Sequence, residues 1–180
     1  MFYIEIIVIC IVGTLLHFTY ELSHHNKYFA IFSAVNESTW EHIKICMTPT
    51  ILWSIYEVIK YGFNGNFLIA KSMCLLTIIL LIPILFYSYT FFTKKSILFI
   101  DVICFYVTVI CSQLIFHYFI DLNNISDIFV YLSIVLLIIE LIAYFCLTFI
   151  PFKNSPVFED PITNKYGIEG HPCNHHHKHK

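Results

Sequence analysis

The chain has 180 residues, of which 58% are hydrophobic and only 12% are charged. Soluble domains carry about 25% charged residues, so this composition excludes an ordinary water-soluble protein and indicates a membrane protein. The formal net charge of -2 offers no basic surface for nucleic acid. At roughly 20 apolar residues for each span, the length accommodates a bundle of about five helices.

Apolar stretches predict an all-α membrane bundle with little internal interruption. In chain order, the expected transmembrane helices are residues 2–20, 37–61, 67–93, 97–120 and 128–150. A short segment before the second helix is too short to cross and is expected to lie at the interface or to re-enter. Residues 1–150 thus form the transmembrane domain, and residues 151–180 form a polar, His-rich tail without a core of its own.

The second stretch is the weakest candidate span, because Lys44, Pro49, Glu57 and Lys60 interrupt it. Ionisable side chains are costly against lipid. This helix is therefore expected to face the interior of the bundle.

Lysine placement predicts the orientation. In a bundle of five spans, Lys27, the pair Lys94 and Lys95, and the tail lysines share one side, whereas Lys60 lies on the other. The positive-inside rule then predicts a plasma-membrane protein with an external N-terminus and a cytoplasmic tail.

A dense polar block, residues 33–42, precedes the second span, and one interpretation of it is structural. Ser38 and Glu41 fit the capping-box pattern, and Asn36 is an alternative N-cap. Trp40 suits the membrane interface. On this interpretation the block is a helix start anchored at the headgroups.

The second interpretation is a functional site. If the helix includes Glu37, then Glu37, Glu41 and Lys44 fall on one stripe of it. The first span ends on the same side of the membrane, where His17 and Glu21 lie four residues apart.

Convergence of these groups would create a site with defined roles. Glu37 and Glu41 are the candidate catalytic carboxylates, and His17, Glu21 and His42 are the candidate ligands of a metal such as zinc. A proton relay and a headgroup-binding site remain alternatives. Substrate-contacting or structural polar roles are expected for Ser33, Asn36, Ser38, Trp40 and Lys44.

Other ionisable residues lie deeper in the spans. His117 and Asp121 form an i, i+4 pair near the external end of the fourth span. Glu57 of the second span is expected at the same depth in the membrane. Glu140 is alone in the middle of the fifth span, so it is either neutral or paired with a lysine or hydroxyl from another helix. These four residues are either structural or a secondary proton relay.

The last ten residues, from His171 to Lys180, are rich in histidine and include Cys173. Imidazoles and a thiolate suit zinc, nickel or copper. Metal affinity in vitro is therefore expected, and an incidental tail is the alternative.

The segment from Phe32 to Lys44 resembles an S-x-V-N-E-S-x-W-E-H-x-K signature in an uncharacterised family of small bacterial multi-pass membrane proteins. The segment from Asp160 to Ile168 resembles a second shared pattern, D-P-x-T-x-x-Y-G-I. The resemblance implies an integral membrane protein of about five spans. It implies no activity.

Three functions fit these observations. The first is a metal-dependent hydrolase acting on a membrane substrate through the carboxylates and histidines near the polar block. The second is an accessory or structural membrane protein, whose polar block caps a helix and docks a protein partner. The third is a small transporter, which would have to be a homo-oligomer because five spans are few. In each case the lipid bilayer is the expected surrounding.

Overall fold

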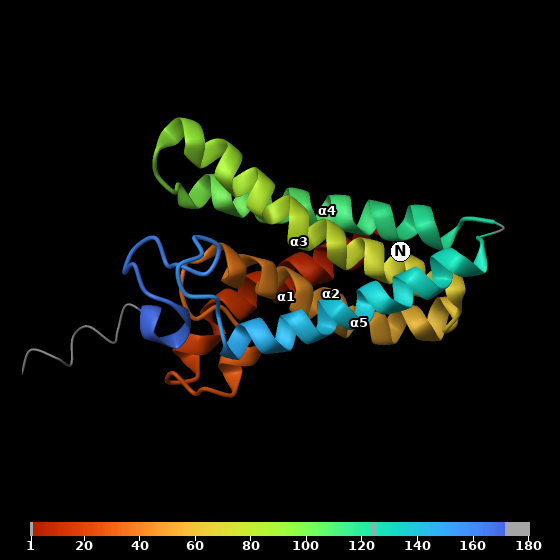
Figure 1. The fold of residues 1–180 in the computed structure, drawn as a ribbon, viewed down its shortest axis with the longest axis horizontal. Coiled ribbons are helices and arrows are strands. Elements are labelled where there is room, and N and C mark those ends of the chain that lie inside the picture. Colours follow the sequence, from red (N-terminus) through yellow and green to blue (C-terminus); the bar gives the residue numbers. More distant parts are fainter. Residues whose placement is uncertain (1, 124, 172–180) are drawn as a thin grey trace, which may run out of the picture.

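The computed structural model describes residues 2–123 and 125–171. Figure 1 shows that this part of the chain is a bundle of long helices. The helices are α1 (Phe2–Leu22), α2 (Thr39–Tyr61), α3 (Gly65–Thr93), α4 (Leu98–Ile120) and α5 (Asp127–Phe149), with short 3-10 helices η1 (Phe29–Ile31) and η2 (Gly167–Gly170). No strand occurs in these residues, which confirms the predicted all-α fold.

Four of the helices, α1, α3, α4 and α5, are long and apolar enough to cross a membrane. At 1.5 Å per residue, their 21 to 29 residues extend roughly 32 to 44 Å, and the hydrocarbon core is about 30 Å thick. Large apolar side chains such as Ile7 and Leu15 on α1 and Leu132 and Ile139 on α5 are exposed. The fold therefore fits an integral membrane protein.

Helix α2 is as long as α4 and α5 but is not apolar enough to count among the candidate spans. As expected, its polar groups face the interior: Lys44, Pro49 and Glu57 are buried. Lys60 is the exception, because it is exposed near the end of the helix, where its ammonium donates to the Tyr61 hydroxyl. The polar content that weakens α2 as a span is thus mostly internal to the bundle.

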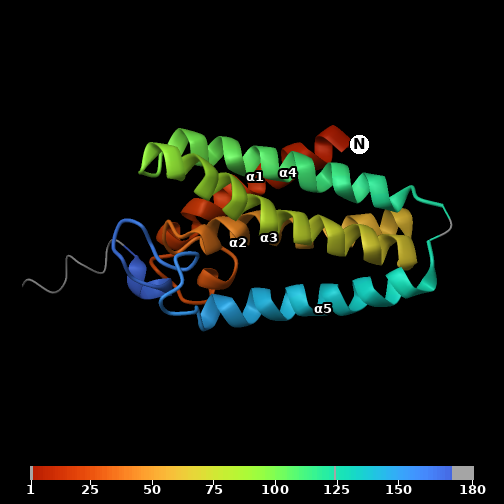
Figure 2. The ribbon, with the colours of Figure 1, turned by 45° about the horizontal axis from the view of Figure 1, so that its top comes forward.

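The helices pack side by side in antiparallel order (Figure 2). Helix α2 packs against both α1 and α3, and α3 packs against α4 and α5. The main apolar core lies between the first four helices. It includes Ile9, Met47, Leu75, Ile78 and Val109, all of which are at most 1% exposed.

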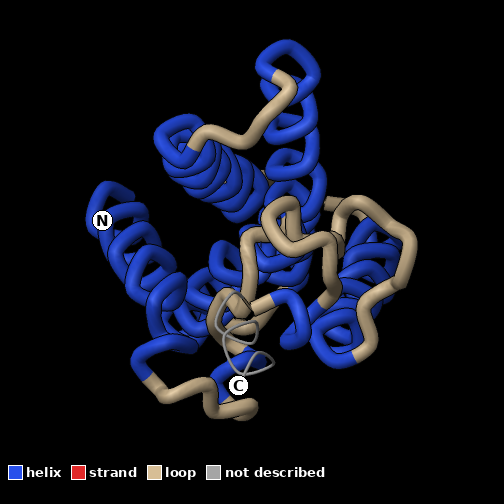
Figure 3. The backbone as a smooth tube through the Cα atoms, turned by 90° about the vertical axis from the view of Figure 1, so that its left-hand side faces the viewer, coloured by secondary structure: helices blue, strands red, loops and turns tan. Residues whose placement is uncertain are grey.

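The loop between α1 and α2 and the segment after α5 gather at one end of the bundle, and Figure 3 looks onto that end. The N-terminus lies at the other end (Figure 1). Residues 151–171 pack against the bundle. Phe158 is buried against the Trp40 ring, with the ring centroids 5.3 Å apart, and Asp160 is completely buried. The histidine-rich residues 172–180 lie outside the described residues.

Candidate metal centre

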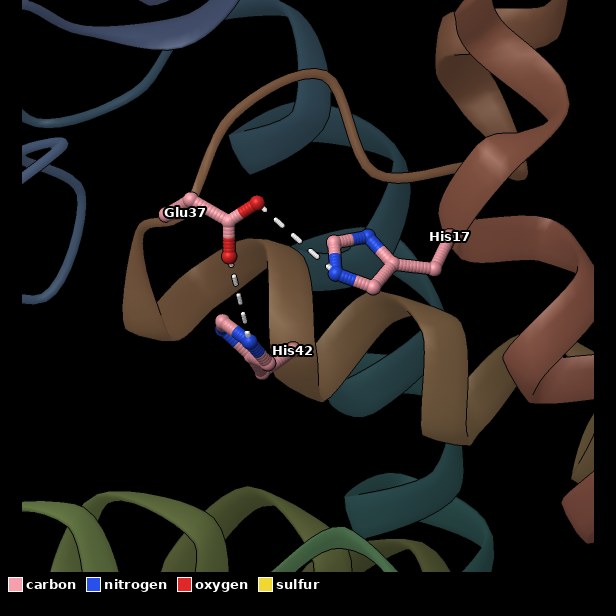
Figure 4. A group of neighbouring side chains, drawn as sticks. All are labelled: His17, Glu37 and His42. Carbon is pink, nitrogen blue, oxygen red and sulfur yellow. Dashed lines mark ion pairs between the residues drawn. The ribbon is translucent and has the colours of Figure 1, made fainter. Parts of the chain in front are cut away.

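Three side chains predicted as site residues meet where the loops gather. His17 comes from α1, Glu37 from the loop before α2, and His42 from the first turns of α2 (Figure 4). One ligand atom of each lies within 4.8 Å of the other two. The Nε2 atom of His17 is 3.7 Å from Glu37 Oε1, and that of His42 is 3.8 Å from Glu37 Oε2.

Both distances are longer than hydrogen bonds, which are about 2.7–3.2 Å long, and fall within the range of ion pairs. Zinc bonds to histidine and carboxylate of about 2.0–2.2 Å place tetrahedral ligand atoms roughly 3.3–3.6 Å apart. The three ligand atoms, which lie within 4.8 Å of one another, would have to move closer together to hold one ion. The Glu37 side chain is 36% exposed, so water can reach the group.

The His42 ring is oriented by the backbone of its own helix. Its Nδ1 atom lies 3.0 Å from the Ser38 carbonyl oxygen, which can only accept a hydrogen bond. Nδ1 therefore donates to this carbonyl, and Nε2 is the ring nitrogen that faces Glu37. Metal-binding histidines are commonly oriented by such a hydrogen bond from their second nitrogen.

Glu37 does not lie on α2, which corrects the expected helical stripe. Helix α2 begins at Thr39, and its N-cap Ser38 has extended backbone angles of φ -70 and ψ 154. The extended residue turns Glu37 away from the face that carries Glu41 and Lys44. Glu37 consequently faces His17 and His42.

Asp160 holds the backbone of Glu37 in place. The Glu37 N–H donates to Asp160 Oδ1 at 3.0 Å, and the Thr163 N–H donates to Oδ2 at 2.7 Å. The Thr163 hydroxyl donates to the same Oδ2. Both oxygens of a completely buried carboxylate are therefore engaged. The two segments singled out in the sequence, residues 32–44 and 160–168, contact each other through this residue.

Further contacts join residues 32–44 to the chain after α5. The Asn36 side-chain amide donates to the Gly167 carbonyl at 2.8 Å. The backbone N–H of Trp40 donates to the Val157 carbonyl at 2.9 Å. Gly170 approaches so closely that an added Cβ would lie 2.9 Å from Asn36 Nδ2. We refer to residues 156–171 as the C-terminal clamp, because they pack over the loop that carries Glu37.

Glu41 does not join the histidines. Its Oε2 atom accepts from the Lys44 ammonium at 2.6 Å and from the Val35 N–H at 3.0 Å, and both side chains are nearly inaccessible. Lys44 also donates to the Ala30 carbonyl at 2.7 Å. The pair therefore fastens the loop before α2 onto that helix. Adjacent helical residues point about 100° apart, which separates Glu41 from His42.

The capping-box interpretation is correct in position but not in its hydrogen bonds. Ser38 is the N-cap, yet its side chain makes no capping bond. Its own N–H donates to Asn36 Oδ1 at 2.9 Å, so Glu41 does not receive that donor. The Glu41 carboxylate instead accepts from the N–H of Val35, three residues before Ser38.

The other residues expected near the site make separate contacts. Glu21 is exposed near the end of α1, where its carboxylate is 4.0 Å from His171. The Ser33 hydroxyl donates to the Phe29 carbonyl within the loop, and Trp40 packs on Phe158. Neither Glu21 nor Glu41 belongs to the His17 group in the described residues.

A pocket of about 60 Å³ adjoins the group between α1, α2 and α4. Besides His17 and His42, Asp101 lines it, and this carboxylate accepts from the hydroxyls of Tyr89 and Ser96. Sequence reasoning did not place Asp101 among the site residues, because no spacing connects it with residues so distant in the chain. The remaining lining residues are Thr14, Ile45, Leu98, Val102, Phe105 and Tyr106.

The ionisable residues deeper in the bundle have other partners than the sequence predicted. His117 pairs with Glu5, at 3.0 Å, rather than with Asp121, which is exposed at the end of α4. Glu57 pairs with Lys71. Glu140 is 3% exposed, and neither of its carboxyl oxygens has a hydrogen-bond partner among the residues that the structure describes.

No curated protein and no solved structure matches the chain. A family model matches residues 1–168, which include all of α1 to α5 and most of the C-terminal clamp. The match agrees with the resemblance to a family without known activity. The chain belongs to DUF6512, a family of unknown function.

Proposed function

We propose that this protein binds a divalent transition metal ion, best fitted by zinc, through His17, Glu37 and His42. The observation that carries the proposal is the approach of three ligand atoms to within 4.8 Å of one another, with the His42 Nδ1 atom already held by the Ser38 carbonyl. Imidazole and carboxylate are ordinary zinc ligands. The ligands come from α1, the following loop and α2, so binding would also join these elements.

The chemistry that this set supports best is metal-assisted hydrolysis. Three protein ligands leave a fourth position for water, as in catalytic zinc sites with two histidines and one glutamate. Zinc lowers the pKa of bound water to about 7 and so supplies a nucleophile at neutral pH. Glu37 then acts as a ligand rather than as the general base. Asp101 is the carboxylate left to accept a proton in the adjoining pocket.

The proposed substrate is a membrane component. The apolar side chains that line the pocket beside His17 and His42 come from α2 and α4. Of the helices around the pocket, α1 and α4 are candidate membrane spans. With the orientation that the lysines predict, the centre would lie at the cytoplasmic end of the bundle. A homo-oligomer remains a prediction.

The test is metal binding by the full-length chain in detergent. The tail histidines at 175–177 and 179 and Cys173 are first replaced by Asn and Ser, since they would bind metal themselves. We expect one zinc ion per chain by elemental analysis, and a characteristic visible spectrum when cobalt replaces zinc. His17→Ala, His42→Ala and Glu37→Gln should each abolish both signals.

His24→Asn is the matched control for these variants. His24 is exposed in the neighbouring loop and has a φ of 55, which asparagine tolerates. This variant should bind metal as the parent does. Absence of bound metal in the tail-substituted chain, or metal retained after His17 and His42 are both replaced, would overturn the proposal.

A structural role for the polar block is the second candidate. It is supported by the buried Glu41–Lys44 pair and by the docking of the C-terminal clamp onto Asn36 and Trp40. In that case Glu37→Gln would leave the protein's metal content at zero and its stability unchanged, whereas Glu41→Gln would reduce stability alone.

A further inference from the structure

The pocket that adjoins the candidate metal centre has a buried floor and an exposed rim. Ile45 of α2 and Phe105 of α4 form the floor and are 4% and 7% exposed, respectively. The rim consists of exposed residues of α1 and α4, which are Thr14, Leu98, Val102 and Tyr106. The accessible side of the pocket is therefore formed by α1 and α4.

At Gly13, α1 packs directly on the floor of the pocket. A Cβ added to this residue would lie 2.6 Å from Phe105 Cζ and 2.9 Å from the Ile45 carbonyl oxygen. The backbone of α1 is thus in close contact with both floor residues. A molecule that enters the pocket therefore reaches it over the exposed rim, between α1 and α4.

The rim faces lipid rather than water, because α1 and α4 are both candidate membrane spans. The 21 residues of α1 extend roughly 32 Å, close to the thickness of the hydrocarbon core. At 1.5 Å per residue, Thr14 and Tyr106 lie about 12 Å from the ends of their helices at Leu22 and Leu98. The rim thus extends from the boundary of the hydrocarbon into it.

The pocket is too small for a lipid headgroup or a peptide segment. Its volume is about 60 Å³, whereas sites that enclose a whole small molecule measure about 300–1,000 Å³. A cavity can hold one water molecule once about 10–15 Å³ is available, so this pocket has room for only a few atoms. It therefore fits one small group of a larger molecule whose remainder stays outside.

The rim supplies a hydrogen-bond donor for such a group. The Tyr106 hydroxyl lies 3.5 Å from Thr14 Oγ1, which is long for a hydrogen bond. Thr14 itself donates to the Cys10 carbonyl at 2.8 Å, so its own proton is engaged. The Tyr106 O–H is therefore available to an acceptor that enters the pocket. The carbonyl groups of acyl lipids are such acceptors, and they lie at the boundary of the hydrocarbon, where the chains join the headgroup.

We propose that this pocket binds the acyl carbonyl of a membrane lipid, which enters sideways from the bilayer between α1 and α4. Tyr106 donates to the carbonyl oxygen, and the acyl chain stays in the bilayer against Val102. As the assignment of a substrate class, this proposal rests on the metal centre proposed above, whose ligands His17 and His42 line the same pocket.

The test is photolabelling of the full-length protein in phosphatidylcholine vesicles that contain a phospholipid with a diazirine beside the carbonyl of one acyl chain. Mass spectrometry locates the labelled residues. We expect label on Ile45 or Phe105, which are buried from lipid at the outer surface of the bundle. Ile139 on α5 is 57% exposed and serves as the reference for ordinary lipid contact.

Two substitutions of Tyr106 examine the route and the hydrogen bond. Tyr106→Trp enlarges the side chain at the rim and should abolish label on Ile45 and Phe105 while leaving label on Ile139. Tyr106→Phe removes one neutral hydrogen bond and should reduce label on the floor residues about 2- to 10-fold. Tyr118→Phe is the matched control, because Tyr118 is 62% exposed on the same helix and does not line the pocket. This control should leave the labelling unchanged.

Two results would overturn the proposal. The first is label on Ile139 without label on Ile45 or Phe105. The second is label on these floor residues that Tyr106→Trp does not reduce. Circular dichroism verifies that each variant is folded, and Val102→Trp at the same rim replaces Tyr106→Trp if that variant does not fold.

The metal content of the same samples separates this proposal from the proposed metal centre. Zinc binding without label on the floor residues would refute the lipid pocket alone. Labelled floor residues in a chain that binds no zinc would refute the metal centre, and with it the role of the lipid as a substrate. Label together with zinc would support both.

Discussion

Asp160→Ala tests whether the C-terminal clamp positions the candidate metal ligand Glu37. The substitution removes the acceptor of the Glu37 N–H, which lies 3.0 Å away, and of two donors of Thr163. A hydrogen bond to a charged acceptor contributes about 1.5–3 kcal/mol. If the loss of the Glu37 hydrogen bond destabilises the zinc-bound protein by this amount, zinc affinity should fall about 10- to 150-fold. Loss of an outer partner of a metal ligand typically reduces affinity about 10- to 100-fold.

The assay is competition for zinc with a coloured chelator, performed on the tail-substituted full-length chain. Asp160→Asn should have a smaller effect, because the amide oxygen can still accept from Glu37. Glu159→Gln is the matched control: its carboxylate faces the Tyr166 hydroxyl, 3.4 Å away, rather than Glu37. If Asp160→Ala lowers the melting temperature but leaves zinc affinity unchanged, the clamp has no positioning role and the reasoning is refuted.

Three further outcomes follow from buried contacts outside the metal ligands. Lys44→Met should reduce the free energy of unfolding by about 3–5 kcal/mol, because it leaves Glu41 charged and buried; adding Glu41→Gln should restore part of this in a denaturant titration. Gly170→Ala should reduce the free energy of clamp docking by about 1–3 kcal/mol, because the added Cβ would lie 2.9 Å from Asn36 Nδ2. Hydrogen exchange should then become faster in the clamp alone, and unchanged exchange would contradict the prediction. Burial lowers the pKa of His171 below its ordinary value of 6.5, so the unfolded clamp binds protons more readily. Clamp docking should therefore be complete above pH 6.5 and weaken as the pH falls below it, and exchange rates in the clamp that do not rise on acidification would contradict this.

The clamp also bears on how the family should be understood. The family match extends to residue 168 and so includes Asp160 and Gly167, well beyond the end of the last long helix at Phe149. Both residues contact the loop before α2. The segment after α5 is therefore part of the folded unit, although its composition is that of a polar tail.

The helices themselves follow directly from the sequence. Long apolar runs predict helices wherever the backbone must satisfy its own hydrogen bonds in lipid. The interruption of the second run correctly predicted an inward-facing α2, because a charged side chain such as Lys44 or Glu57 can be accommodated only among other polar groups. These conclusions need only composition and local order.

Local spacing also drew attention to His17, Glu37 and His42, but only the tertiary structure decided which carboxylate faces the histidines. One extended residue, Ser38, excludes Glu37 from the helix and separates it from Glu41. The partners Asp160 of Glu37 and Glu5 of His117 are more than 100 residues away in sequence. Helical periodicity predicts which residues share a face of one helix, but the face that meets another helix depends on how side chains of all the helices pack together. For that reason the sequence indicated the groups available for chemistry, and the packing of the bundle determined which of them meet.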